Sequence, residues 1–124
     1  MLALRGPLGA GKSVLARAVA RGTGIAAALP SPTFNLLFQY QTARAEIFHL
    51  DLYRLESADQ VWELGWSELG SGRQMVLIEW PERAEALLPP DRWDITLAVE
   101  AQSAELRELF AVRHGAAPAL PELE

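Results

Sequence analysis

The feature that most constrains this chain is a glycine-rich octapeptide close to its start. Residues 6–13 read Gly-Pro-Leu-Gly-Ala-Gly-Lys-Ser, the complete Gly-x4-Gly-Lys-Ser pattern of a phosphate-binding loop. The apolar residues 2–4 precede it, and residues 14–21 follow it with the spacing of an amphipathic helix. Glycines let backbone N–H groups converge on phosphate oxygens, and the helix N-terminus adds a partial positive charge. The octapeptide therefore predicts a strand, a loop and a helix of the P-loop nucleotide-binding class.

Two side chains of the loop carry the chemistry expected at a nucleotide site. Lys12 should reach the β- and γ-phosphates as a point charge, and the Ser13 hydroxyl should bind Mg²⁺. The sequence contains no Asn-Lys-x-Asp stretch, the pattern that reads guanine. We therefore expect ATP with Mg²⁺ as the ligand, rather than GTP.

Two carboxylates are candidates for the acidic partner that a P-loop needs. Glu79 follows the uninterrupted apolar run 75–78, and Asp51 follows residues 47–50. The C-terminal ends of strands form the edge where α/β sheets bind ligands, and a surface carboxylate at a strand end is the less favoured alternative for each residue. The apolar run before Glu79 requires cover on both faces, which favours a place beside the loop strand and a role near Mg²⁺. Asp51 is then expected nearer the γ-phosphate.

Three further residues have both a possible functional role and a purely structural one, and the sequence favours different roles for each. Thr33 lies in a proline-containing loop that could sense the γ-phosphate, but a plain turn fits its position at least as well. His49 lies in an apolar stretch without nearby metal-ligand residues, so we interpret it as a packed histidine. Among the four tryptophans, Trp80 is the one expected to line the nucleotide site, because it directly follows Glu79.

The remaining pattern predicts a series of short strands and helices. The helix after the loop should turn Val14, Leu15, Ala18 and Val19 to the core. Residues 34–41 alternate as a strand, and the strand at 47–50 follows too closely for a crossover, so the two should form an antiparallel hairpin. Residues 93–99 form another strand, and 105–112 fit either a helix or a strand. We expect one P-loop ATPase domain over residues 1–113 and a flexible tail over 114–124.

Composition narrows the range of partners. The chain has 124 residues, a net charge of -5 and no cysteine, which excludes disulfides and thiolate metal sites. Its basic residues are scattered, so direct RNA binding is disfavoured and any role in RNA biology should act through a partner. No apolar run approaches the ~20 residues needed to cross a bilayer, and we expect a cytoplasmic protein without membrane contact.

Four blocks of sequence together resemble the bacterial TsaE (YjeE) family. They are the glycine loop, Ser-Pro-Thr-Phe at 31–34, His-Leu-Asp-Leu-Tyr-Arg-Leu at 49–55 and Leu-Ile-Glu-Trp-Pro-Glu at 77–82. That family is the ATPase component of tRNA threonylcarbamoyladenosine biosynthesis, and the resemblance runs from about residue 2 to 99 and less closely to 113. It implies that the phosphates are wrapped by Leu8, Gly9, Ala10, Gly11, Lys12 and Ser13.

The resemblance also implies roles and partners. Ser13 and Glu79 would hold Mg²⁺, while Thr33 and Asp51 would belong to the hydrolysis machinery together with Lys12. The implied partners are the TsaD and TsaB proteins, which modify tRNA, so that tRNA is met only indirectly. Because the chain carries no arginine placed to stabilise the transition state, we expect a weak ATPase that depends on its partners. A small-molecule kinase and a non-catalytic module switched by ATP are the alternatives.

The chain departs from the family pattern at its start. Family members usually carry a helix and part of a strand ahead of the glycine loop, whereas five residues precede Gly6 here. The fold that the resemblance implies is therefore the family's α/β P-loop architecture, a mixed sheet flanked by helices, with this N-terminal corner truncated, and the residues that contact the nucleotide base are left open.

Overall fold

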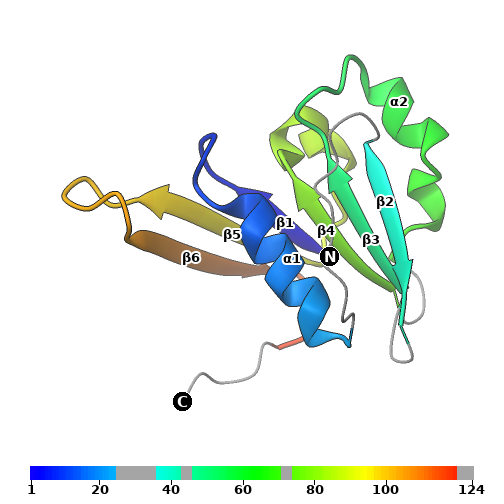
Figure 1. Cartoon of the computed structure of the whole chain (residues 1–124). Coiled ribbons are helices and arrows are strands. Elements are labelled where there is room, and N and C mark those ends of the chain that lie inside the picture. The colour runs from blue at the N-terminus through cyan, green and yellow to red at the C-terminus, as the bar shows by residue number, and fades with distance from the viewer. Residues whose placement is uncertain (25–35, 43–45, 71–73, 120–124) are drawn as a thin grey trace.

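A mixed sheet organises the computed structural model, which describes residues 1–24, 36–42, 46–70 and 74–119. Within these residues the sheet has six strands in the order β2-β3-β4-β1-β5-β6 (Figure 1). The strands are β1 Leu2–Arg5, β2 Leu37–Gln41, β3 Glu46–Asp51, β4 Gln74–Glu79, β5 Arg92–Val99 and β6 Arg107–His114. The four inner strands are parallel, and the two outer ones pair antiparallel with their neighbours. The predicted α/β mixed sheet with an antiparallel hairpin is thereby confirmed.

The position of β4 brings Glu79 to the glycine loop. The strand pairs with β1 on one side and β3 on the other. Leu4 is opposite Glu79 across the first pair, and Asp51 is opposite Glu79 across the second. The C-terminal ends of three adjacent parallel strands therefore meet where the loop begins, as expected for a ligand-binding edge.

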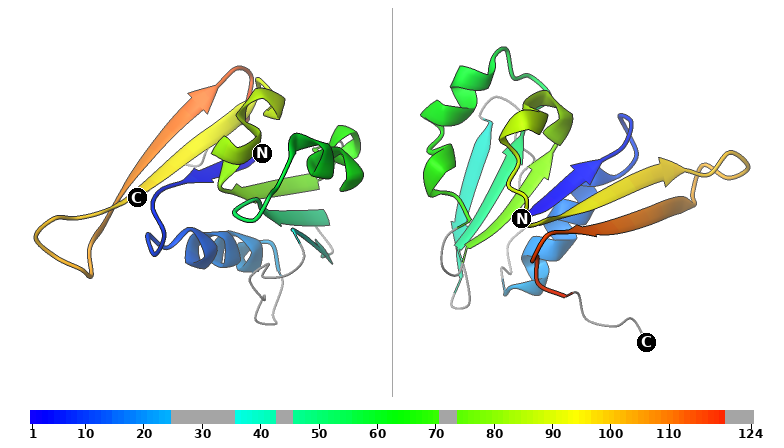
Figure 2. Two further views of the ribbon diagram at one scale, coloured as in Figure 1. Left: turned by 90° about the horizontal axis from the view of Figure 1, so that it is seen from above. Right: turned by 180° about the vertical axis from the view of Figure 1, so that it is seen from behind.

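Helices cover the two faces of the sheet unequally. Helix α1 (Lys12–Gly22) lies on one face, and α2 (Ala58–Glu63), η1 (Trp66–Glu68) and η2 (Pro81–Leu87) lie on the other (Figure 2). On the α1 side the buried cluster is Leu4, Ala16, Ala20, Ile47, Leu77 and Ile95. On the other side it is Phe48, Leu50, Leu52, Leu55, Val61, Trp66, Val76, Ile78 and Ala84. Successive residues of β4 thus enter opposite cores, which accounts for its unbroken apolar run.

The face that α1 turns to the sheet differs from the predicted one. Ala16 and Ala20 are buried, whereas Ala18 is exposed and Val14 is 62% exposed. The stripe centred on Ala16 and Ala20 packs on the sheet, with Leu15 and Val19 partly buried beside it, and small alanine side chains suit close packing. The prediction that Val14 and Ala18 face the core was therefore wrong.

The ambiguous segment 105–112 belongs to a strand. β6 pairs with β5 from Val99 opposite Arg107 to Arg92 opposite His114. The boundary at residue 114 stays a prediction, but part of the predicted tail packs against the domain. Ala117 is buried, and the Trp93 indole N–H donates to the Pro118 carbonyl at 2.7 Å. Among the described residues, none of the helices has the length and apolar character that a membrane crossing requires.

Candidate nucleotide-binding site

Close packing and unusual backbone angles restrict which residues the glycine loop can carry where it leaves β1. Gly6, Gly9 and Gly11 have φ values of 141°, 81° and 102°. A Cβ on Gly6 would lie 2.4 Å from the Leu97 carbonyl oxygen of β5, so no larger residue fits there. The loop then turns through a hydrogen bond from the Ala10 N–H to the Pro7 carbonyl, and α1 begins at Lys12. Its glycines supply backbone angles that other residues adopt only with strain.

A cavity of about 310 Å³ opens between this loop, the ends of β3 and β4, and the start of η2. That volume is within the usual range for small-molecule sites. Its lining contains every predicted site residue that the structure describes, namely Leu8, Gly9, Ala10, Gly11, Lys12, Ser13, Asp51, Glu79 and Trp80. Val14 and Tyr53 complete the lining, and neither was predicted. The remaining predicted residue, Thr33, lies outside the described residues.

Lys12 is held in place by the loop that carries it. Its Nζ donates to the carbonyl oxygens of Gly6 and Pro7, and it lies 3.7 Å from the centre of a Trp80 ring. The residue is only 4% exposed. Burial lowers the pKa of the Lys12 ammonium group, while the charges of Glu82, Glu79 and Asp51 oppose that shift. A desolvated cation at the N-terminus of a helix is suited to binding an anionic ligand.

Glu79 is the most constrained acid of the cavity. Its Oε1 accepts a hydrogen bond of 2.6 Å from the Ser13 hydroxyl, and its Oε2 lies 2.6 Å from His49 Nε2. Glu79 is 2% exposed and His49 is 1% exposed. Buried polar groups are costly unless they are paired, so each of these side chains needs the other.

Asp51 is placed differently, at the end of β3 and partly open to the cavity. Its Oδ1 accepts a hydrogen bond of 3.0 Å from the Tyr53 N–H. Burial is the largest influence on this carboxyl and raises its pKa; Glu79 adds to the rise, while the Tyr53 N–H, His49 and Lys12 oppose it. A carboxylate with a raised pKa is a better proton acceptor than an exposed one.

Aromatic side chains form one wall of the cavity. Trp80 adopts a left-handed conformation, with φ of 57° and ψ of 50°, directly after β4. The centre of its ring lies 4.9 Å from the centre of the Tyr53 ring, and the Arg83 guanidinium lies over the Tyr53 ring, 5.8 Å from its centre. A non-glycine residue in this region is strained, and such strain is concentrated at functional sites.

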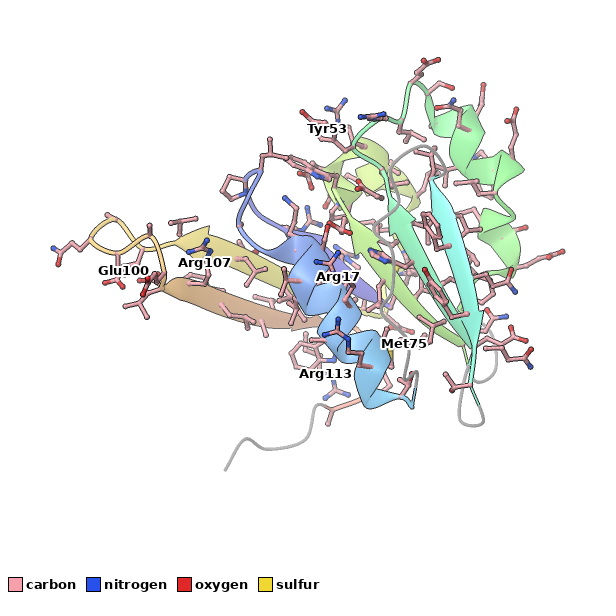
Figure 3. All side chains as sticks on the ribbon, in the orientation of Figure 1. Arg17, Tyr53, Met75, Glu100, Arg107 and Arg113 are labelled. Carbon is pink, nitrogen blue, oxygen red and sulfur yellow. The ribbon has the colours of Figure 1, made fainter. Side chains whose placement is uncertain are left out.

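Besides Val14 and Tyr53, the described residues include two, Arg107 and His49, that contact the site and were not assigned to it from the sequence. Arg107 of β6 donates from Nε to the Ala10 carbonyl at 3.1 Å, and its Nη2 approaches the Gly9 carbonyl at 3.5 Å. Figure 3 shows Arg107 and Tyr53 on either side of the glycine loop in this view. His49 was interpreted as a packed histidine. It is packed, but it also contacts Glu79. No local pattern indicated either contact, because both depend on pairing between distant strands.

The donor set at the end of β4 fits Mg²⁺. A serine hydroxyl and a carboxylate are hard oxygen ligands, the kind that this ion takes. Within the described parts of the chain no group of three or more His, Cys, Asp or Glu side chains could hold a metal by itself. Proteins usually bind Mg²⁺ through one or two side chains together with phosphates and water.

Comparison with known proteins identifies relatives of this chain. The sequence family described as "Threonylcarbamoyl adenosine biosynthesis protein TsaE" matches residues 1–109. The tRNA threonylcarbamoyladenosine biosynthesis protein TsaE of Rickettsia felis is 42% identical over 97 residues, which are 77% of this chain and 56% of that protein. The protein of the same name from Bacillus subtilis is 36% identical over 97 residues, covering 78% of this chain and 60% of that protein. The chain thus spans little more than half the length of these relatives.

The fold has a solved counterpart. A crystal structure of YdiB from Bacillus subtilis is similar with a TM-score of 0.67 and 28% sequence identity, covering 92% of this chain and 68% of that one. The family match extends from β1 into β6 and includes every residue that lines the cavity. Sequence, fold and site therefore agree, and the chain belongs to the TsaE family.

Proposed function

We propose that this protein binds and slowly hydrolyses ATP with Mg²⁺, as an accessory protein of tRNA threonylcarbamoyladenosine biosynthesis. The pathway follows from the family and from the names of its relatives. The single observation that carries the activity is the meeting of Lys12, Ser13, Asp51 and Glu79 around one cavity bounded by a phosphate-binding loop.

The residues of the cavity divide the work by their chemistry. The loop N–H groups and Lys12 bind the phosphates, and Ser13 and Glu79 hold the ion. When bound, Mg²⁺ would offset the negative charge of the phosphates. Asp51, which lines the same cavity from β3, is placed to orient the attacking water and accept its proton, a role that its raised pKa favours. Trp80 and Tyr53 shield one side of the cavity from water.

Partners are proposed on the same family basis. We expect the protein to act through TsaD and TsaB, and to meet tRNA only indirectly. A net charge of -5 supports this, because a protein that grips RNA alone normally carries a basic surface. An arginine or another cation supplied by the partner would raise the rate of hydrolysis, as partner-supplied groups do in other P-loop proteins.

Calorimetric titration of ATP with Mg²⁺ into the parent chain and into Lys12→Ala tests the site. Lys12→Ala should lose binding by about 10–100-fold, the scale of a charge-assisted hydrogen bond, and keep the circular dichroism of the parent. Arg21→Ala, which removes a cation from the last turn of the same helix, is the matched control and should bind normally. Equal affinity of Lys12→Ala and the parent would show that the loop is not the nucleotide site.

A second experiment tests the proposed partners. Release of phosphate is followed for the protein alone, and then with TsaD and TsaB added. We expect slow turnover alone and a clear increase with both partners present. Turnover of tens per second by the isolated chain, typical of finished enzymes, would contradict the proposal, as would a rate that the partners leave unchanged.

A further inference from the structure

Of the three polar or charged residues that are buried in the described part of the chain, Lys12, His49 and Glu79, the proposed function leaves His49 without a role. It lies in the interior of β3 and is almost completely inaccessible. Its Nε2 lies 2.6 Å from one carboxylate oxygen of Glu79, while the Ser13 hydroxyl donates to the other at 2.6 Å. Each oxygen of the carboxylate thus has its own partner, and the two partners come from different elements.

The strand register explains why His49 reaches Glu79. His49 is opposite Leu77, and Asp51 is opposite Glu79, in the parallel pair β3–β4. Histidine and glutamate are therefore diagonal neighbours on the sheet face that also carries Leu77 and packs against α1. Diagonal neighbours on a sheet lie within reach of long side chains. The contact is built into the pairing of two central strands and does not depend on a surface loop.

We propose that His49 is a positioning residue for the metal site: it holds Oε2 of Glu79 so that Oε1 faces Ser13. The inference rests on the proposed function, since it concerns the Mg²⁺ site of that function. A glutamate side chain has three rotatable bonds, and the charge of Glu79 also interacts with Lys12. Without His49, nothing among the described contacts fixes Oε2, and the carboxylate is free to turn toward that cation.

The expected effect follows from the behaviour of outer partners at metal sites. Groups that orient a metal ligand typically change metal affinity by about 10–100-fold when they are removed. The phosphates, in contrast, are bound by the loop N–H groups and Lys12, none of which His49 contacts in the described structure. Loss of His49 should therefore weaken the metal-dependent part of nucleotide binding and leave the metal-independent part intact.

The test compares three substitutions of one residue. His49→Leu removes the contact, His49→Gln places an amide nitrogen at a similar reach to Nε2, and His49→Asn carries the same amide on a shorter side chain. Tyr40→Phe is the matched control. It removes a buried hydroxyl group from β2, the strand next to β3, and this hydroxyl has no hydrogen-bond partner in the described structure. For each variant, ADP affinity is measured by calorimetry in EDTA and then against increasing Mg²⁺.

We expect all variants to bind ADP in EDTA within about two-fold of the parent, which also shows that they are folded. The quantity to compare is the Mg²⁺ concentration that gives half of the metal-dependent increase in ADP affinity. In His49→Leu and His49→Asn this concentration should rise by about 10–100-fold. In His49→Gln and Tyr40→Phe it should stay within a few-fold of the parent. Should His49→Leu not fold, the comparison of Gln with Asn decides the question, since both are polar and differ only in reach.

Three results would overturn the inference. The first is an unchanged Mg²⁺ requirement in His49→Leu and His49→Asn. The second is an equal loss of affinity with and without Mg²⁺, which would make His49 merely structural. The third is a Gln variant as impaired as the Asn variant. If the parent itself gains no affinity from Mg²⁺, the proposed metal-dependent function fails as well, and this outcome is distinct from the other three.

Discussion

Strands β4 and β6 belong to one sheet but have opposite environments. β4 is enclosed by strands on both edges and by helices on both faces, and Val76, Leu77 and Ile78 have no exposed surface. β6 pairs with β5 alone, and every residue except His114 is exposed. Yet β6 also carries apolar side chains, with Leu109 51% exposed and Phe110 55% exposed. Apolar residues are therefore buried in β4 and exposed in β6, so apolar character alone does not predict burial.

The two strands also serve the site in different ways. β4 contributes through its position, because its C-terminal end places Glu79 beside the glycine loop. β6 contributes through one long side chain, because Arg107 reaches two carbonyl groups of the loop from outside the cavity. The buried strand thus supplies a residue of the cavity lining, whereas the edge strand contacts the glycine loop from outside the cavity.

The largest difference between the strands should appear in stability. Ile78→Ala removes a buried side chain from the β4 core and should lower the free energy of unfolding by about 2–5 kcal/mol. Leu109→Ala in β6 is the matched change at an exposed position and should cost about 0.5 kcal/mol or less. Urea denaturation measures both. Equal losses of stability would mean that Leu109 is buried in solution, so that β4 and β6 would not differ in their environments.

The next largest effect separates the two carboxylates at the ends of β3 and β4. Asp51→Asn should keep ATP and ADP affinity within a few-fold and lose about 100-fold of partner-stimulated hydrolysis, the scale of a positioned proton acceptor. Glu79→Gln should instead raise the Mg²⁺ requirement for nucleotide binding. Titration of Mg²⁺ against each variant decides between these roles. If Asp51→Asn raised the requirement and Glu79→Gln did not, the two roles would have to be exchanged.

A smaller effect is expected where β6 contacts the loop. Arg107→Ala should weaken ATP binding by about 3–10-fold, since it removes a hydrogen bond worth about 0.5–1.5 kcal/mol that holds the loop. Arg113→Ala is the control on the same strand, because Arg113 donates to the Ala117 carbonyl and not to the loop. Calorimetry on both variants measures the difference. An unchanged affinity in Arg107→Ala would show that the loop keeps its shape without β6.

The smallest effect concerns charge at the far end of the β5–β6 pair. Asp94 accepts hydrogen bonds from Arg92 at 3.0 Å and lies 2.9 Å from His114. Burial alone would raise the pKa of Asp94, but the Arg92 hydrogen bond and the charges of Arg5, Arg92 and His114 outweigh it and hold the pKa below its usual value. A carboxyl whose pKa is lower in the folded than in the unfolded protein stabilises the folded state at any pH above its unfolded-state pKa. This stabilisation is lost as the pH falls through its folded-state pKa.

Asp94→Asn should therefore lower the free energy of unfolding at pH 7 by less than about 1 kcal/mol, and the deficit should shrink as the pH falls below about 4. Urea denaturation of both proteins at several pH values measures this. A deficit that grew in acid would contradict the sign of the pKa shift.

The sequence predicted some parts of this molecule and missed others for physical reasons. The run at 75–78 was predictable because burial on both faces demands continuous apolar residues. The hairpin was predictable because the residues between the two strands, 42–45, are too few for a crossover. The segment 105–112 was not, because an exposed edge strand has no pattern imposed by burial. The α1 face was misjudged, since close packing favoured Ala16 and Ala20 over larger side chains.

The same division applies to the site. Loop residues and strand-end carboxylates follow local patterns, and the structure brings those it describes around one cavity. The contacts of His49 and Arg107 are long-range, linking residues 30 and 97 positions apart in sequence. They depend on strand order, which no single segment specifies. The role of Thr33 stays a prediction.

The close approach of Gly6 to β5 has a thermodynamic consequence for the ligand. At Gly6 one added methyl group would collide with the Leu97 carbonyl, so the base of the loop packs directly against β5. The backbone entropy of that segment is therefore lost when the protein folds, and not when the nucleotide arrives. For the proposed nucleotide, an ordered loop base would leave less conformational entropy to be lost on binding.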